Sequence, residues 1–371
     1  MSYSKTAVKT FPFLGKCLIF VILCWNLFHL MPVAPSGFTE AEFGILVALF
    51  LAFLPVRVSS FLFFASAELA LFYLIYDGLY GLAKLAGARA AFLMFTFDGM
   101  LVPVVWALYL LYGVISAKRI VTTSYKITTK HAVPDGNLRI LQLSDTHPAR
   151  LQTRRMMKRF YAVAENTKPD MIVLTGDIFD EFTQPSKFKE YCKFFADTRP
   201  RYGTWYVFGN HDAEWHWHRP ALTREDICRR FAVAGVAILE AECAHICGGA
   251  IRIAGRRDAM EERLTPEQLL AEPFGGLTVL LCHEPVELTA CAEAGADVTF
   301  AGHTHGGQIF PLGLLMKHVT KTHELNAGIR EILPGKFAVV LLFQLNRINP
   351  CISCDHDAID NPADLVDHAS L

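Results

Sequence analysis

Five short polar blocks in the second half of this chain each follow an apolar run closely. The apolar runs, which we interpret as buried strands, cover residues 138–143, 171–174, 204–208, 277–281 and 298–301. The polar blocks behind them are Asp145-x-His147, Asp177, Asn210-His211-Asp212, His283 and His303-x-His305. Segments of helical character lie between the strands, at 154–167, 188–195 and 223–234. Strands that alternate with helices predict an α/β fold, whose ligand sites lie at the carboxyl ends of the strands.

The polar blocks supply carboxylate, amide and imidazole groups, and they contain no thiolate. This mixture of oxygen and nitrogen donors suits divalent ions such as Mn, Fe or Zn. Two cations held a few ångströms apart need a negative group between them, and the Asp177 carboxylate could supply it. Two metal ions held in this way can activate water and bind the oxygens of a phosphoryl group. The blocks therefore predict a site for two divalent metal ions.

Each block has a plainer interpretation when it is taken alone. A Gly-Asp or an Asn-His-Asp sequence is commonly a turn or a helix cap, and a histidine at a strand end is commonly structural. Five such blocks in order, each behind an apolar strand, are difficult to obtain by chance. We therefore favour the metal site over five separate structural roles.

The ordered blocks resemble those of the calcineurin-like metallophosphoesterases, over about residues 138–311. The resemblance implies a four-layer α/β/β/α sandwich that hydrolyses phosphoester or pyrophosphate bonds. It also implies that one metal is held by Asp145, His147, Asp177 and His305, and the other by Asp177, Asn210, His283 and His303. By the same resemblance, His211 protonates the leaving group, and Asp212 orients His211.

The Gly306-Gly307-Gln308 segment after the last histidines resembles a membrane-associated branch of this family, which includes UDP-2,3-diacylglucosamine pyrophosphatase. A lipid-linked phosphorylated substrate is the corresponding expectation. Residues 317–371 depart from the pattern of that branch, although 337–343 could supply a last strand. A membrane scaffold or sensor that binds metal without turnover is the alternative, and the intact set of polar blocks argues against it.

Apolar residues, 52% of the whole chain, are concentrated before Lys118. Four apolar stretches there predict about four membrane spans, at 17–33, 43–56, 58–82 and 90–115. Lys and Arg residues that flank these stretches predict a multi-pass protein of a bacterial inner membrane, with the catalytic domain in the cytoplasm. The formal net charge of -1 gives no reason to expect a nucleic-acid partner.

These patterns divide the chain into three parts. Residues 1–118 form the predicted transmembrane region, 119–345 the phosphoesterase domain, and 346–371 an irregular C-terminal tail. The expected partners are the membrane and a phosphorylated substrate.

Overall fold

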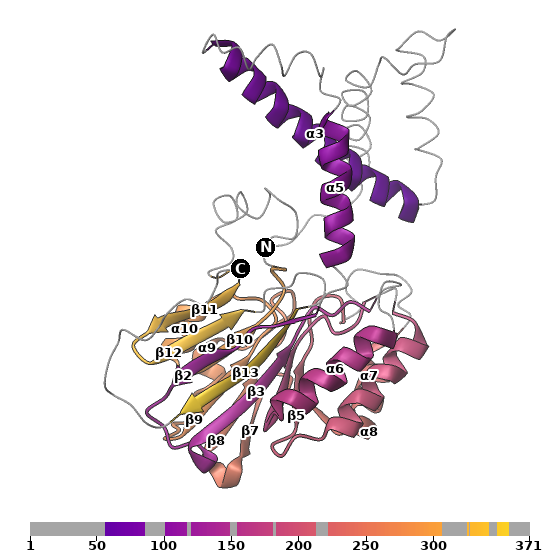
Figure 1. The fold of residues 1–371 in the computed structure, drawn as a ribbon. Helices are drawn as coiled ribbons and strands as arrows, with labels where there is room; N and C mark the ends of the chain where they lie inside the picture. Colours follow the sequence, from indigo (N-terminus) through magenta and orange to yellow (C-terminus); the bar gives the residue numbers. More distant parts are fainter. Residues whose placement is uncertain are drawn as a thin grey trace. The chain divides into compact units, whose positions relative to one another are not determined.

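The computed structural model describes residues 56–85, 101–116, 120–148, 154–180, 183–212, 222–305, 325, 327–340 and 347–355. The chain divides into two compact units, Met1–Val114 and Ile115–Leu371. Figure 1 labels the helices and strands of both units.

The described part of the first unit consists of two helices, α3 (Val56–Leu85) and α5 (Leu101–Ser116). They pack against each other through the buried side chains of Leu69, Tyr73 and Val102. The ring of Phe72 also contacts that of Tyr109, with 5.5 Å between the ring centroids.

The predicted multi-pass membrane location is contradicted by these helices. Within the described residues, neither helix combines the length and the apolar character needed to cross a bilayer. Helix α5 has 16 residues, fewer than the roughly 20 that a span requires. Helix α3 is longer, but it carries Glu68, Asp77 and Lys84. The first two predicted spans, 17–33 and 43–56, lie almost entirely outside the described residues.

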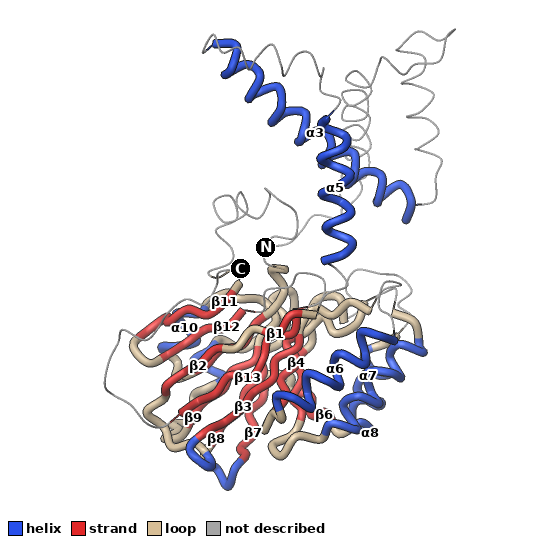
Figure 2. Tube along the Cα trace, in the orientation of Figure 1, coloured by secondary structure: helices blue, strands red, loops and turns tan. Residues whose placement is uncertain are grey.

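The second unit is built on two β-sheets, coloured red in Figure 2. The first sheet has seven strands in the order β1-β13-β3-β4-β5-β6, with β2 also paired to β13. Its strands are β1 (Val121–Thr122), β2 (Tyr125–Thr128), β3 (Asn137–Leu143), β4 (Met171–Thr175), β5 (Thr204–Val207), β6 (Val236–Ile238) and β13 (Arg347–Asp355). Strands β3, β4, β5 and β6 run parallel.

The second sheet has six strands in the order β11-β12-β10-β9-β8-β7. Its strands are β7 (Glu242–Ile246), β8 (Ile251–Gly255), β9 (Leu277–Leu281), β10 (Val298–Ala301), β11 (Gly328–Leu333) and β12 (Lys336–Val340). Strands β8, β9, β10 and β12 run parallel, so their carboxyl ends share one edge.

Helices cover the outer face of each sheet. The first sheet packs against α6 (Arg154–Thr167), α7 (Pro185–Thr198) and α8 (Arg224–Ala234). The second packs against α9 (Pro266–Leu269) and α10 (Leu288–Glu293). Single 3-10 turns lie at Pro134–Gly136 and Cys247–Gly249. A third core fills the space between the sheets, so the unit is layered α/β/β/α.

The sequence explains the helical layer locally. Helix α6 buries Met156, Met157, Phe160 and Ala164, a spacing that places apolar side chains on one face. Helix α8 begins after Thr223, whose side chain accepts the backbone N–H of Asp226. It ends at Gly235, which adopts the left-handed conformation (φ 76°) common after helices.

Strand β13 differs from the expected irregular tail after residue 345. Residues 347–355 form a strand that pairs antiparallel with β3 and parallel with β1 and β2. The sequence did not predict this strand, because its residues mix polar and apolar types without a clear pattern. Its pairing partners also lie far away in the chain, so local sequence carries little information about it.

Candidate metal centre

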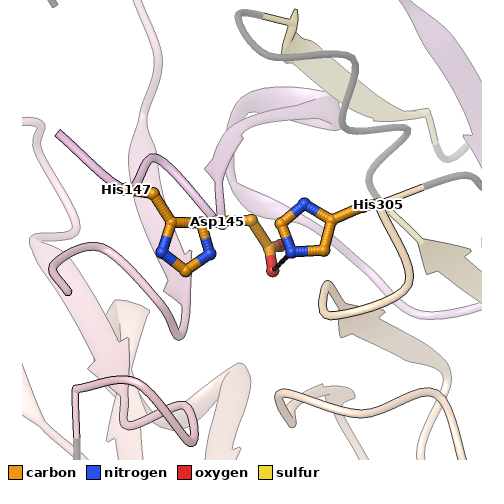
Figure 3. Close-up of side chains that lie close together, drawn as sticks. All are labelled: Asp145, His147 and His305. Carbon is orange, nitrogen blue, oxygen red and sulfur yellow. Dashed lines mark ion pairs between the residues drawn. The ribbon is translucent and has the colours of Figure 1, made fainter. Parts of the chain in front are cut away.

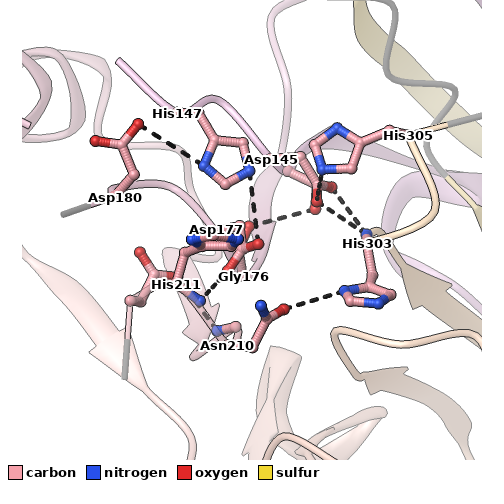
Figure 4. A network of polar contacts seen from close by, with 12 residues as sticks. Asp145, His147, Gly176, Asp177, Asp180, Asn210, His211, His303 and His305 are labelled. Carbon is pink, nitrogen blue, oxygen red and sulfur yellow. Dashed lines mark hydrogen bonds and ion pairs between the residues drawn. The ribbon is translucent and has the colours of Figure 1, made fainter. Parts of the chain in front are cut away.

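The predicted ligands all follow parallel strands, at the carboxyl-terminal edges of the two sheets. Strands β3, β4 and β5 of the first sheet precede Asp145 and His147, Asp177, and Asn210. Strands β9 and β10 of the second sheet precede His283, and His303 and His305. The structure brings all seven side chains together in two neighbouring groups. Figure 4 shows these side chains, with the exception of His283, which it does not label.

The first group contains Asp145, His147 and His305, whose ligand atoms lie within 4.8 Å of one another. His305 Nε2 lies 3.7 Å from Asp145 Oδ1 (Figure 3). The His147 and His305 rings are stacked, with their centroids 5.3 Å apart. Both Asp145 oxygens accept the backbone N–H of His303, which joins this group to the other sheet.

The second group contains Asp177, His283 and His303, again with ligand atoms within 4.8 Å of one another. Asn210 belongs with them, because its Oδ1 lies 3.0 Å from His283 Nε2 and 3.1 Å from His303 Nδ1. His283 Nε2 and His303 Nδ1 are themselves 3.1 Å apart. Four donor atoms therefore converge on one point.

One carboxylate oxygen lies between the two groups. Asp177 Oδ2 is 3.5 Å from His147 Nε2 in the first group and 3.3 Å from His283 Nε2 in the second. Asp177 is 1% exposed, so water does not solvate or screen the charge of its carboxylate. This is the position that a carboxylate shared by two cations would occupy.

The donor chemistry fits a cation in the second group. His283 Nδ1 lies 2.8 Å from the carbonyl oxygen of Thr175, so it carries a proton and donates to that oxygen. In a neutral ring, Nε2 then presents a lone pair to the oxygens of Asp177 and Asn210. Electron-rich atoms this close repel one another unless a proton or a metal ion lies between them.

Burial and neighbouring charges set the protonation of the predicted ligands. Burial lowers the pKa of His147 to about 3 and that of His305 to about 4, so both rings are neutral near pH 7. Burial raises the pKa of Asp145 to about 7, and the charge of Asp177 adds to this. Burial opposes a charge on His283, but the Asp177 and Asp145 carboxylates outweigh it and raise its pKa well above 6.5.

The surrounding charges also keep Asp177 ionised. Burial alone would raise its pKa, but His283 chiefly, with His147 and His211, lowers it below the ordinary value of 3.8. A buried carboxylate that stays charged at neutral pH is a strong attractant for a cation.

Five predicted ligands have a left-handed backbone, which non-glycine residues rarely adopt. The φ angles are 51° for Asp145, 35° for His147, 51° for Asp177, 68° for His303 and 50° for His305. Each such residue costs on the order of 1–3 kcal/mol, and strain of this kind collects at functional sites. The backbone strain and the converging donors therefore mark the same positions.

The two predicted catalytic residues lie beside this centre. The His211 ring meets the edge of the His147 ring, with 5.0 Å between the centroids, and its backbone N–H donates to Asp177 Oδ1. Asp212 is buried, and its carboxylate accepts the backbone N–H groups of Ile178, Phe179 and Gly209. These bonds join the loop of Asp177 to the loop of Asn210.

Sequence reasoning missed Asp180. Its Oδ2 lies 3.9 Å from His147 Nδ1, on the opposite side of the ring from Asp177 (Figure 4). A carboxylate in this position orients a ligating imidazole and makes it more basic. The signal was the spacing of Asp177 and Asp180, three residues apart on one loop.

Comparison with known proteins agrees with this geometry. The calcineurin-like phosphoesterase family matches residues 138–307. A metallophosphoesterase of Aquifex aeolicus, itself uncharacterized, is 30% identical over 227 residues, which cover 58% of this chain and 80% of that protein. The chain belongs to the calcineurin-like metallophosphoesterase family. The two groups of donors are candidate sites for divalent metals in a chain of this family.

Other metallophosphoesterase relatives match over a smaller share of their length. An uncharacterized metallophosphoesterase of Helicobacter pylori is 30% identical over 190 residues, covering 49% of this chain and 48% of that protein. A transmembrane protein with a metallophosphoesterase domain from Danio rerio is 27% identical over 208 residues, covering 48% and 43%. The chain thus spans about half the length of these curated relatives.

Proposed function

We propose that this metallophosphoesterase hydrolyses a phosphoester or pyrophosphate bond at a centre of two divalent ions, of Mn, Fe or Zn type. The observation that carries the proposal is the position of Asp177 Oδ2, close to a ligand nitrogen of each group. The proposed ligands of one ion are Asp145, His147, Asp177 and His305. Those of the other are Asp177, Asn210, His283 and His303.

The protein's own side chains prepare this chemistry. A bound pair of divalent ions would activate water and neutralise the charge of the phosphoryl oxygens. Neutral His147 and His305 keep their lone pairs available as donors. His211, half-buried at the rim of the centre, is the proposed proton donor to the leaving group, since imidazole exchanges protons near neutral pH.

Asp212 supports His211 through the backbone in this proposal. Its carboxylate binds the N–H groups of Phe179, at 2.7 Å, and Gly209, at 3.2 Å. It therefore fixes the loop that carries Asn210 and His211 against the loop of Asp177. We expect Asp212 to position His211 in this way.

The finer hypothesis is a lipid-linked phosphate or pyrophosphate substrate, of the kind that UDP-2,3-diacylglucosamine represents. Two observations support it. The sequence Gly306-Gly307-Gln308 resembles that branch, and the Danio rerio relative is described as a transmembrane protein.

The alternative function is a scaffold or sensor that binds metal without turnover. Its site would need the same ligands but no proton donor. The presence of His211 beside the metal ligands favours the enzyme.

Hydrolysis of bis-p-nitrophenyl phosphate by the full chain with added Mn²⁺ tests the proposal. We expect turnover that His211→Ala lowers by about 100-fold or more, as loss of an acid-base group does. Asp177→Asn should abolish turnover and metal binding together. Asp170→Asn, the same change at the opposite end of β4, is the matched control and should retain both.

Two results would contradict the proposed enzymatic function. No turnover by a chain that binds Mn²⁺ would favour the scaffold, and unchanged turnover in Asp177→Asn would exclude the proposed centre. Once turnover is established, comparison of lipid-linked with water-soluble pyrophosphates tests the finer hypothesis.

A further inference from the structure

Gln142 is a polar residue in the apolar core between the two sheets. Strand β3 alternates, so Leu138 and Ile140 face the second sheet, while Leu141 and Leu143 face the helices. Gln142 continues the row of Leu138 and Ile140 and is 1% exposed. It stands three residues before Asp145, at the end of the strand that carries the predicted ligands.

The Gln142 side chain joins the two sheets. Its amide nitrogen donates to Thr175 Oγ1 on β4, at 2.9 Å, and to the carbonyl oxygen of Ala301 on β10, at 2.8 Å. Thr175 lies two residues before Asp177, and Ala301 lies two residues before His303. One amide group thus connects three of the ligand-bearing strand ends.

Each group of metal-binding side chains draws on both sheets. Asp145 and His147 come from the first sheet and His305 from the second, while Asp177 and Asn210 face His283 and His303. A small shift of one sheet along the other would therefore separate the donors of both groups at once. Metal affinity depends on such distances to within a few tenths of an ångström.

Other hydrogen bonds between the sheets near this point, within the described residues, involve predicted ligands. The His303 N–H donates to Asp145, His283 Nδ1 donates to the Thr175 carbonyl oxygen, and Asn210 Oδ1 lies 3.0 Å from His283 Nε2 and 3.1 Å from His303 Nδ1. The Gln142 bond uses no atom of a predicted ligand. It can therefore be removed without changing the donor set.

The unpaired oxygen of Gln142 argues that its role is not simply stability. Among the residues that the structure describes, Gln142 Oε1 is buried without a hydrogen-bond partner. An unpaired buried oxygen costs free energy, and an apolar side chain of the same length would avoid that cost. The Gln142 amide instead fixes the distance between the ends of β3 and β10.

We propose that Gln142 is a positioning residue. It holds the ends of β3 and β10 at a fixed distance across the two sheets and so sets the affinity of the centre for divalent ions. This inference rests on the proposed two-metal centre. The side-chain hydrogen bonds of Gln142 involve no donor atom of the predicted metal ligands.

Mn²⁺ binding to the full chain, measured by titration calorimetry or by equilibrium dialysis with metal analysis, tests the inference. In Gln142→Met, which keeps the length of the side chain and removes both N–H donors, we expect the dissociation constant to rise about 10- to 100-fold. Activity at saturating Mn²⁺ should recover most of the wild-type value. Gln142→Leu should show the same loss and provides a second variant in case one of them folds poorly.

Ile140→Val is the matched control, because it loosens the same face of the same strand two residues farther from the ligands. Its thermal stability should fall, while its Mn²⁺ affinity stays within about twofold of wild type, as expected at a site away from the ligand positions. Equal loss of affinity in Ile140→Val and Gln142→Met would overturn the inference, and so would unchanged affinity in Gln142→Met. Failure of the wild-type chain to bind Mn²⁺ would instead overturn the proposed two-metal centre.

Discussion

At the scale of single residues, a buried carboxyl pair lies next to the proposed metal centre. Asp258 is fully buried and Glu284, the neighbour of His283, is 5% exposed. Asp258 Oδ1 accepts the backbone N–H of Met260, and Glu284 Oε2 accepts that of Ala259. Burial first, and then the charge of Glu284, raise the pKa of Asp258 to about 7. The pair therefore favours one shared proton over two negative charges.

Asp258 should make the folded chain less stable as the pH rises. Its pKa is higher in the folded state than in the unfolded chain, so the stability it contributes at pH 4 is lost as the pH approaches 7. Asp258→Asn keeps the acceptor for Met260 and removes the charge. We expect the free energy of unfolding at pH 8 to rise by about 1–3 kcal/mol, since one pKa unit corresponds to about 1.4 kcal/mol.

Urea unfolding at pH 5 and pH 8 measures this effect. Glu293→Gln, at an exposed position on α10, is the control and should leave the pH dependence as in wild type. A variant Asp258→Asn that loses stability at pH 8 would contradict the assignment of a buried, destabilising charge.

The sequence indicated candidate ligand residues more readily than the residues that we propose to position them. Asp145, Asp177 and His283 could be found because their type and their place after an apolar strand are both visible in the sequence. Gln142 could not, because its partner Ala301 is 159 positions away and only the fold brings them together. Asp180 was missed since its role depends on the orientation of the His147 ring.

At the scale of strands and loops, close approach of the two sheets requires a small residue at the end of β10. A Cβ atom on Gly302 would overlap Ser144 Oγ and Asp145 Oδ2 on the loop after β3. The glycine thus allows the His303 N–H to reach the Asp145 carboxylate. The spacing between these two loops is set by the absence of a side chain.

Gly302→Ala should therefore weaken both folding and metal binding. Overpacking of this kind costs about 1–3 kcal/mol, and here it also displaces a predicted ligand. Thermal unfolding with and without Mn²⁺ measures both effects. Gly275→Ala is the control, because a Cβ there meets no atom within 4 Å, and it should leave both quantities nearly unchanged. Equal behaviour of the two variants would argue against the tight approach of the sheets.

The elements found from sequence were those with a strong local pattern. Helix α6 and strands β9 and β10 begin and end where the apolar periodicity placed them. Strand β13 was missed because its pairing is entirely with distant segments. Strand β7, at the edge of the second sheet, was missed because its residues show no regular alternation of buried and exposed side chains.

At the scale of the whole molecule, the predicted membrane location was wrong, whereas the two-metal centre stays a prediction whose residues the fold brings together. Apolar content alone predicted spans, and no helix in the described ranges has the length and apolar character to be one. The metal centre was predicted from residue types in a fixed order, which is a more specific pattern. The two sheets contribute predicted ligands to both groups, so we expect metal binding to depend on how the sheets pack.

The central claim is a centre of two metal ions that share Asp177, and metal stoichiometry tests it most directly. Equilibrium dialysis of the full chain against Mn²⁺, followed by metal analysis, should give about two ions per chain, because two donor groups are present. Asp177→Asn should lose both ions, since its carboxylate faces both groups. Binding of one ion or none by the wild-type chain, or two ions retained by Asp177→Asn, would contradict the account.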